Sequence, residues 1–184
     1  MIRFLLLYII YLKQKVNDFG RVKYNGFTVY FAFKNSKILV GRGSVINSGP
    51  LTNLLGLYQR TIIIARYGGR IAIGKNTGIS GSTIYSMSEI KIGENCVIGA
   101  NCKIVDNDFH PLAEEKRLDE RPSDISKKPI HIGDKCFIGM NSIILKGTTI
   151  GNNSVVGAGS VVSGSFPENV IIAGNPAKII KYLA

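Results

Sequence analysis

The chain has 184 residues, 45% of them hydrophobic and 19% charged, which is the make-up of one ordinary globular domain and excludes a disordered chain. Its 23 lysine and arginine residues outnumber 12 aspartate and glutamate residues, giving a formal net charge of +11 at pH 7. Such a charge indicates an anionic partner, either a membrane surface, an acidic polymer, a phosphorylated cofactor or nucleic acid. The basic residues are scattered, without an aromatic-interleaved stretch, so the sequence argues against nucleic acid.

The chain begins with an apolar run, residues 1–12, in which Arg3 is the one charged residue. The run is too short to span a bilayer, and it lacks the basic lead and the cleavage site of a signal peptide. We expect residues 1–37 to form an apolar helix and a lead-in. This helix either caps the open end of the following domain or lies on the inner membrane face. The second alternative would use the basic residues Lys13, Lys15, Arg21 and Lys23.

A period of six dominates the second segment, residues 38–184. Twelve frames begin with a large apolar head, and these heads are Ile73, Ile79, Tyr85, Ile92, Ile98, Ile104, Ile132, Ile138, Ile144, Ile150, Val156 and Val162. A mostly small residue follows four positions after each head, and glycine follows seven of the heads directly. One large and one small inward side chain per six residues, with a glycine corner, describes one side of a three-sided coil. The pattern predicts a parallel β-helix.

The repeat is interrupted in three places. The frame slips by one residue between Tyr85 and Ile92, and the repeat stops between Ile104 and Ile132. Upstream, Val40, Ser44 and Ile46 predict an earlier partial coil, whereas the register of residues 51–72 cannot be assigned from the pattern.

The three cysteines, Cys96, Cys102 and Cys136, occupy the small inward position of their frames. We therefore expect reduced, buried thiols that serve neither as nucleophiles nor as metal ligands. Cys96 and Cys136 hold the same position on either side of the long interruption. They should be neighbours on successive turns.

Chemistry is expected in that interruption, a polar loop over residues 107–129, because long loops in compact coils are usually functional. His110 lies at its start, where an imidazole can act as a general base near neutral pH. The carboxylates of Asp106 and Asp108 could orient this histidine or bind an acceptor hydroxyl. The other histidine, His131, precedes an inward isoleucine and should point outward.

The sequence resembles the hexapeptide-repeat acyltransferases, and within them the galactoside and maltose O-acetyltransferases and their relatives in surface-polysaccharide biosynthesis. The resemblance covers residues 70–184 and rests on the hexads and on four runs. These are residues 106–111 (DNDFHP), 132–139 (IGDKCFIG), 150–162 (IGNNSVVGAGSVV) and 173–178 (AGNPAK).

The resemblance implies a left-handed β-helix that forms a homotrimer, uses acetyl-CoA, needs no metal and has each active site between two subunits. It makes His110 the catalytic base for direct attack of a sugar hydroxyl on the thioester. Cofactor contacts carried over from the family fall on Met140, Ala158, Ser163, Gly164, Lys178 and Lys181. It also implies a cytoplasmic enzyme, at the inner membrane face if the N-terminal segment binds lipid. The last segment, residues 166–184, is expected as a tail.

Other functions were also considered. An N-acetyltransferase of an amino-sugar nucleotide and an antibiotic acetyltransferase share the repeat, and a non-catalytic trimeric scaffold would leave His110 without a role. A γ-type carbonic anhydrase needs three histidines on zinc, whereas this chain has two.

Overall fold

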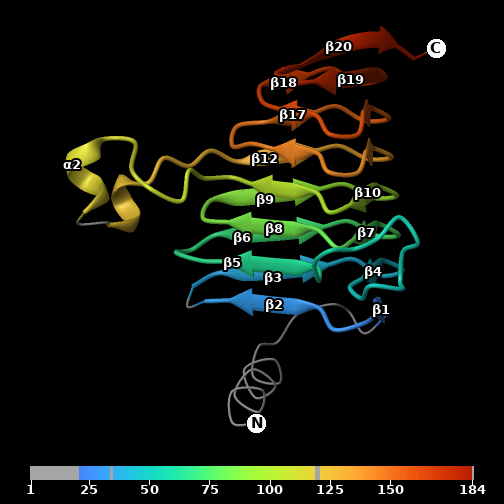
Figure 1. Ribbon diagram of the computed structural model, residues 1–184, viewed down its shortest axis with the longest axis horizontal. Helices are drawn as coiled ribbons and strands as arrows, with labels where there is room; N and C mark the ends of the chain where they lie inside the picture. The colour runs from blue at the N-terminus through green and yellow to red at the C-terminus, as the bar shows by residue number, and fades with distance from the viewer. Residues whose placement is uncertain (1–20, 34, 119–120, 184) are drawn as a thin grey trace.

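The computed structural model describes residues 21–33, 35–118 and 121–183. In this part of the chain the strands form the three sides of a coil, and successive strands pass to sheets 1, 2 and 3 in turn (Figure 1). Strand pairs are parallel throughout the coil, and β19 and β20 pair antiparallel at its C-terminal end. The fold class expected from the sequence, an all-β left-handed parallel β-helix with a protruding loop, is confirmed.

The strand bounds within the described residues are as follows. Sheet 1 contains β1 (Lys23–Asn25), β4 (Val45–Asn47), β7 (Gly78–Ser80), β10 (Val97–Ala100), β13 (Phe137–Ile138), β16 (Val155–Val156), β19 (Val170–Gly174) and β20 (Ala177–Tyr182). Sheet 2 contains β2 (Val29–Ala32), β5 (Ile62–Ala65), β8 (Thr83–Ser86), β11 (Lys103–Val105), β14 (Ile143–Ile144) and β17 (Val161–Val162). Sheet 3 contains β3 (Lys37–Val40), β6 (Arg70–Ile73), β9 (Glu89–Ile92), β12 (Ile130–Ile132), β15 (Thr149–Ile150) and β18 (Ser165–Phe166).

The coil begins earlier than the sequence pattern indicated. Strands β1 (Lys23–Asn25) and β2 (Val29–Ala32) pair with β4 and β5, so these strands belong to the coil and not to a lead-in. The expected N-terminal helix lies outside the described residues. Among those that are described, no helix has the length and apolar character needed to cross a bilayer.

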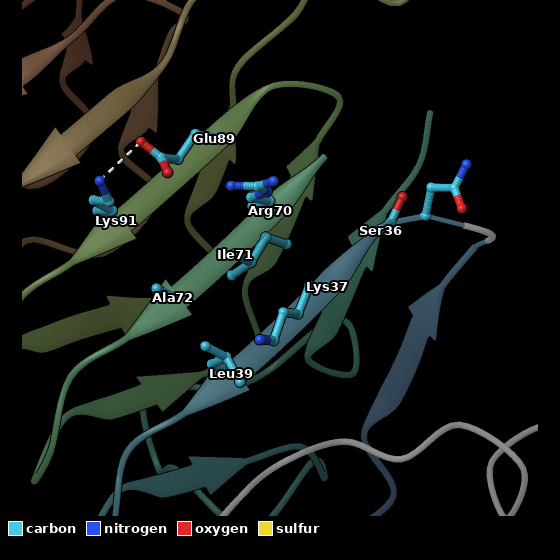
Figure 2. A pocket seen from close by; sticks show the side chains of 9 residues that line it. Ser36, Lys37, Leu39, Arg70, Ile71, Ala72, Glu89 and Lys91 are labelled. Carbon is cyan, nitrogen blue, oxygen red and sulfur yellow. Dashed lines mark ion pairs between the residues drawn. The ribbon is translucent and has the colours of Figure 1, made fainter. Parts of the chain in front are cut away.

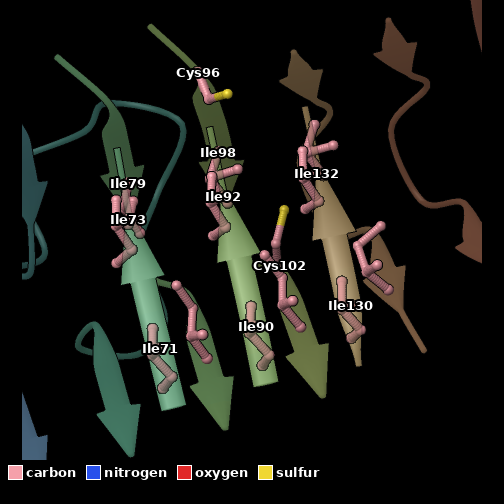
Figure 3. Packing of buried hydrophobic residues seen from close by; sticks show 14 of the residues in the cluster. Ile71, Ile73, Ile79, Ile90, Ile92, Cys96, Ile98, Cys102, Ile130 and Ile132 are labelled. Carbon is pink, nitrogen blue, oxygen red and sulfur yellow. The ribbon is translucent and has the colours of Figure 1, made fainter. Parts of the chain in front are cut away.

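Stacked isoleucines fill the axis of the coil (Figure 3). Ile90 of β9 lies in register between Ile71 of β6 and Ile130 of β12, and Ile92 continues a second column. Strands β6, β9 and β12 of sheet 3 thus turn two large side chains inward. The other two sheets mostly pair one large inward residue with one small one, which leaves room at their corners.

The small inward residues bind the next turn of the coil. Thr77 Oγ1 donates to the carbonyl oxygen of Gly93 at 2.9 Å, and Cys96 Sγ donates to that of Gly133 at 3.1 Å. Ser82 Oγ makes the same contact at another corner, with Gly99 at 3.0 Å. The small position therefore requires a donor as well as a small volume, which serine, threonine and cysteine all provide.

The thiols lie at the inward positions expected from the sequence. All three cysteines are buried and unpaired in disulfides, and the register of β10 with β13 makes Cys96 and Cys136 neighbours on successive turns. The contact with Cys136, reinforced by burial, raises the pKa of Cys96. Burial likewise raises the pKa of Cys102.

The prediction that Tyr85 points inward is wrong. Ile84, and not Tyr85, fills the axis, and Tyr85 lies half-buried on the outer surface of β8. The cause is a frame that is one residue short. Only Ser80 lies between Ile79 and the corner residue Gly81, whereas two residues lie between Ile98 and the equivalent corner residue Asn101. Ser82 and Ile84 therefore take the inward positions. Ile84 lies five residues after Ile79 and eight before Ile92, so the repeat loses one residue before Tyr85 and gains two between Tyr85 and Ile92.

Glycine corners allow successive turns to approach closely. A Cβ on Gly74 would lie 2.5 Å from the carbonyl carbon of Gly93, closer than side-chain carbons approach backbone. This close approach explains why glycine follows so many of the heads.

The isoleucine column predicts that each inward isoleucine contributes strongly to the stability of the fold. Replacing Ile90 with alanine should lower the free energy of unfolding by about 2–5 kcal/mol, because it leaves a cavity between Ile71 and Ile130. Urea unfolding at a fixed protein concentration measures the change. Lys91→Ala on the outward side of the same strand is the control, with an expected loss below about 1 kcal/mol. Equal losses in the two variants would contradict the inward assignment of Ile90.

Candidate active site

The loop over residues 107–129 leaves the coil after β11 and returns at β12, protruding from the corner between sheets 2 and 3 (Figure 1). It contains α2 (Glu114–Arg117) and the short 3-10 helix η1 (Pro122–Asp124). Its two ends are joined by a bridge between Asn107 and Lys127. The root is thus part of the coil, whereas the exposed Leu112 and Leu118 lie farther along the loop.

Asp106 anchors the loop root from a fully buried position. Its carboxylate accepts hydrogen bonds from Ser86 Oγ at 2.6 Å and from the amides of Met87 and Ser88 at 2.8 and 2.9 Å. A further donor, Asn107 Nδ2, lies at 3.1 Å. These four donors satisfy the buried charge. Asp106 therefore holds the preceding corner in place instead of binding an acceptor or orienting His110 as expected.

The carboxylate of Asp108 is paired with Lys146, which lies one turn farther along the same column of corners, after β14. Both side chains are about four-fifths buried. The backbone of Asp108 also contributes, because its carbonyl oxygen accepts the amide of His110 at 2.7 Å and its own amide donates to Ser126 at 3.0 Å. Asp108 thus fixes the backbone on both sides of the loop while its side chain binds the neighbouring turn.

His110 follows a sharp reversal of the chain at Phe109, which has a φ of +61°. An aromatic residue adopts this conformation only where its surroundings hold it. Here the Phe109 ring packs on Tyr85 with centroids 4.7 Å apart, and its amide donates to Asn107 Oδ1 at 3.0 Å. The reversal leaves the imidazole of His110 at the surface, on a backbone that the coil fixes.

The second histidine, His131, is exposed on the outer side of sheet 3, as the sequence predicted. Its Nε2 lies 3.4 Å from Glu89 Oε2. Hydrogen bonding from Lys91, with a smaller contribution from His131, lowers the pKa of Glu89. No group of three or more histidine, cysteine or acidic side chains that could hold a metal ion occurs in the described ranges.

Met140 and Ala158 lie at equivalent corners between sheets 1 and 2, one turn apart. The carbonyl oxygen of Met140 accepts the amide of Gly159 at 2.8 Å, which ties the two corners together. In the described part of the chain, the amides of Met140 and Ala158 donate to no backbone carbonyl. They are free to bond an external acceptor, whatever side chain stands there.

The remaining expected cofactor residues lie nearer the C-terminal end of the coil. Ser163 and Gly164 are exposed at the corner between sheets 2 and 3, in the column that carries Lys146 and the loop root. Lys178 and Lys181 are exposed on β20, in register with Ala173 and Ile171 of β19. The expected tail is thus partly an antiparallel hairpin on sheet 1 and not a free segment.

Apart from Lys178 and Lys181 on β20, the expected residues fall on two columns of corners that flank sheet 2. One column carries the loop root with His110, and then Lys146, Ser163 and Gly164. The other carries Met140 and Ala158. Sequence reasoning missed Lys146 and the packing of Tyr85, since neither is visible without the stacking of turns. The available signal for Lys146 was its place two residues after the inward head Ile144.

One hollow lies elsewhere, on the outer side of sheet 3 (Figure 2). It has a volume of about 600 Å³, and its lining includes Lys37, Arg70 and Lys91 on adjacent strands. None of the expected site residues lines it.

The similarity to known proteins agrees with the hexapeptide pattern of the sequence. A family model described as the hexapeptide repeat of succinyl-transferase matches residues 89–104 and 129–163. The chain is 37% identical over 116 residues to a galactoside O-acetyltransferase of Escherichia coli K12, covering 62% of this chain and 55% of that protein. It is 39% identical over 103 residues to the putative lipopolysaccharide biosynthesis O-acetyl transferase WbbJ of the same organism, covering 53% of each chain. The chain thus spans about half the length of the curated relatives it matches.

Among solved structures, a galactoside acetyltransferase in complex with coenzyme A superposes with a TM-score of 0.55 at 27% identity. The match covers 89% of this chain and 65% of that one. The three-sided coil and the phase of its hexads agree with these similarities: residues 89–104 and 129–163 carry the hexapeptide repeat of succinyl-transferase, and the chain is similar to acetyltransferases.

Proposed function

We propose that the protein is an acetyl-CoA-dependent O-acetyltransferase that acts on a sugar hydroxyl with His110 as general base. His110 removes the proton from the acceptor hydroxyl as its oxygen attacks the thioester carbonyl carbon. The carbon–sulfur bond then breaks, and the proton passes from His110 to the departing CoA sulfur. The products are an acetyl ester and free CoA.

The observation that carries this proposal is the exposed imidazole of His110 on an otherwise immobilised backbone. The Asp108 carbonyl and the packing of Phe109 fix the residues on its N-terminal side. A general base needs such placement, because its contribution depends on hydrogen-bond reach to the reacting proton. The alternative route through an acyl-cysteine is disfavoured, since Cys96, Cys102 and Cys136 are all buried and each thiol donates to a backbone carbonyl.

Two features support acetyl-CoA as the donor. The free amides of Met140 and Ala158 can bond the pantetheine or thioester oxygen, and Lys178 and Lys181 present charge for its phosphates. A similar solved structure is a complex with coenzyme A. For this chain, a strongly basic surface is also consistent with such an anionic co-substrate.

The outward faces of the coil support a homotrimer. Val97 and Phe137 on sheet 1 and Ile143 on sheet 2 are 51%, 46% and 37% exposed in the single chain. Sheet 3 instead turns charged residues outward, with Lys37, Arg70, Glu89, Lys91 and His131 on adjacent strands. Covering sheets 1 and 2 with neighbouring subunits would bury the apolar side chains and leave sheet 3 in water. The corners at Met140 and Ala158 would then lie between subunits.

We further propose that the acceptor belongs to surface-polysaccharide biosynthesis and is handled in the cytoplasm at the inner membrane face. The names of two relatives, a galactoside O-acetyltransferase and a putative lipopolysaccharide biosynthesis O-acetyl transferase, support a sugar acceptor. The basic charge and the apolar residues 1–12 support proximity to an anionic membrane.

Replacing His110 with alanine should lower the turnover number by at least about a hundredfold, because the hydroxyl then loses its base. Thiol release from acetyl-CoA with a panel of sugars measures turnover, while gel filtration and CoA titration check assembly and cofactor binding, which should be retained. His131→Ala is the matched control and should leave turnover unchanged. Full turnover in a folded His110→Ala trimer would refute the assignment.

Replacing Lys178 and Lys181 together with alanine should raise the Michaelis constant for acetyl-CoA several-fold with little effect on turnover. Phosphate contacts remote from the thioester stabilise the ground and transition states alike. The double variant Lys75→Ala, Lys91→Ala removes the same charge from other faces and is the control. An identical Michaelis constant for acetyl-CoA in both double variants would show that Lys178 and Lys181 are solvated surface residues that do not bind the cofactor.

Removing residues 1–15 should release the protein from anionic vesicles at low salt while leaving activity on a soluble sugar largely intact. The reason is that this segment carries the apolar run together with Lys13 and Lys15. Vesicle co-sedimentation over a salt series measures binding, with neutral vesicles as the control. If the intact chain does not bind anionic vesicles, the membrane part of the proposal is wrong.

A further inference from the structure

A second excursion, residues 48–61 between β4 and β5, packs on the corner column that leads to Met140. Asn101 Nδ2 donates to the carbonyl oxygen of Gly56 at 3.0 Å, and Gln59 Nε2 donates to that of Gly81 at 2.8 Å. Leu57 is buried beneath the excursion. One turn farther on, the amide of Asn141 donates to Ala100 at 2.8 Å. The excursion therefore sits directly before the Met140 corner, at the edge of sheet 2.

Lys103 extends from the outward side of β11 into this excursion. Its Nζ contacts Gln59 Oε1, lies 3.3 Å from Thr83 Oγ1, and approaches the centroid of the Tyr58 ring to 5.9 Å. No carboxylate of the described residues forms an ion pair with it, although Lys75, Lys91, Lys116 and Lys146 all have such a partner. Partial burial lowers the pKa of Lys103, which reflects the cost of a charge without a counter-ion.

Beside this cation the excursion encloses a hollow of about 240 Å³, whose lining includes Leu57, Tyr58, Gln59 and Arg60. Tyr58 and Gln59 also contact Lys103, so the cation lies against the wall of the hollow that these two side chains form. Arg60 adds a second positive charge, with its guanidinium carbon 5.2 Å from the centroid of the Phe27 ring. The volume is slightly below the range of about 300–1,000 Å³ for drug-sized ligands, as suits a single sugar ring.

We propose that Lys103 and this hollow form a subsite for an oxyanion on the acceptor, either the carboxylate of an acidic sugar or the phosphate of a phosphorylated one. This inference rests on the proposed acetyltransferase function and names the class of its acceptor. An oxyanion would supply the counter-charge that Lys103 lacks, with a charge-assisted hydrogen bond to Nζ. Gln59 and Thr83 already hold Nζ in place, so little side-chain freedom is lost on binding.

The location fits an acceptor subsite. Lys103 is in register with Ile143 on β14, and sheet 2 lies between the corner column of Met140 and that of His110. An acceptor whose acidic group binds at Lys103 would lie next to the excursion, at the edge of sheet 2 that borders the corner column of Met140. Specificity for charge would thus be set by a residue that takes no part in proton transfer.

The test compares two probes that differ only at C6, methyl glucuronoside with a carboxylate and methyl glucoside with a hydroxymethyl group, using the full chain without acetyl-CoA. Equilibrium binding by NMR titration should favour the glucuronoside by about tenfold or more in the natural protein. Lys103→Met should abolish this preference, and Lys103→Arg, which keeps the charge, should retain most of it. Lys75→Met removes an exposed charge on another corner and should have no effect.

Glucose 6-phosphate forms a third arm that separates the two sources of the oxyanion. Tighter binding than the glucuronoside identifies a phosphorylated acceptor, and weaker binding identifies a carboxylate. Equal affinity for the charged and neutral glycosides, or a preference that survives in Lys103→Met, would overturn the subsite. Acetylation assays on the same probes report on the proposed function separately, because binding is measured without turnover.

Discussion

The contact between one turn and the next is the interaction on which every other feature of this protein depends. Each turn meets its neighbour through backbone ladders on three sides, a column of large apolar side chains, and a small inward residue that donates to a corner carbonyl. The donation from Thr77 to Gly93 and that from Cys96 to Gly133 follow one rule, although the chemistry of the donor differs. Because each turn contacts only its neighbours, stability is a sum of such local interfaces.

This stacking also explains why the candidate site can be exposed and yet rigid. Corners of the coil are held by ladder bonds on both sides, so an amide that is left free there points in a fixed direction. The loop root is held by the buried carboxylate of Asp106, which binds the preceding corner, and by Asp108, which binds the following turn. His110 is therefore tied to three successive turns, a form of preorganisation that a loop with free ends could not provide.

The sequence predicted most of the coil because the six-residue pattern repeats many times along the chain. Hexads from Ile92 onward are in the register that the pattern gave, including the inward cysteines and the return of the chain at Ile132. The pattern failed where a single residue is missing from a frame, since the short link between Ile79 and Gly81 moves Ile84 inward and Tyr85 outward. It also gave no register between residues 51 and 72, where Ile62, Ile63 and Ile64 are equally apolar and only pairing with β8 selects Ile63.

The two long excursions leave the coil at different corners but border the same sheet. Residues 48–61 depart before β5 and residues 107–129 depart before β12, and strand register continues undisturbed past both. The parts of the molecule that would meet a substrate are thus separable from the part that folds. Exchanging either excursion for another of different length would alter which molecules are accepted without altering a single stacked isoleucine, so this architecture permits new specificities to arise by insertion rather than by rebuilding the core.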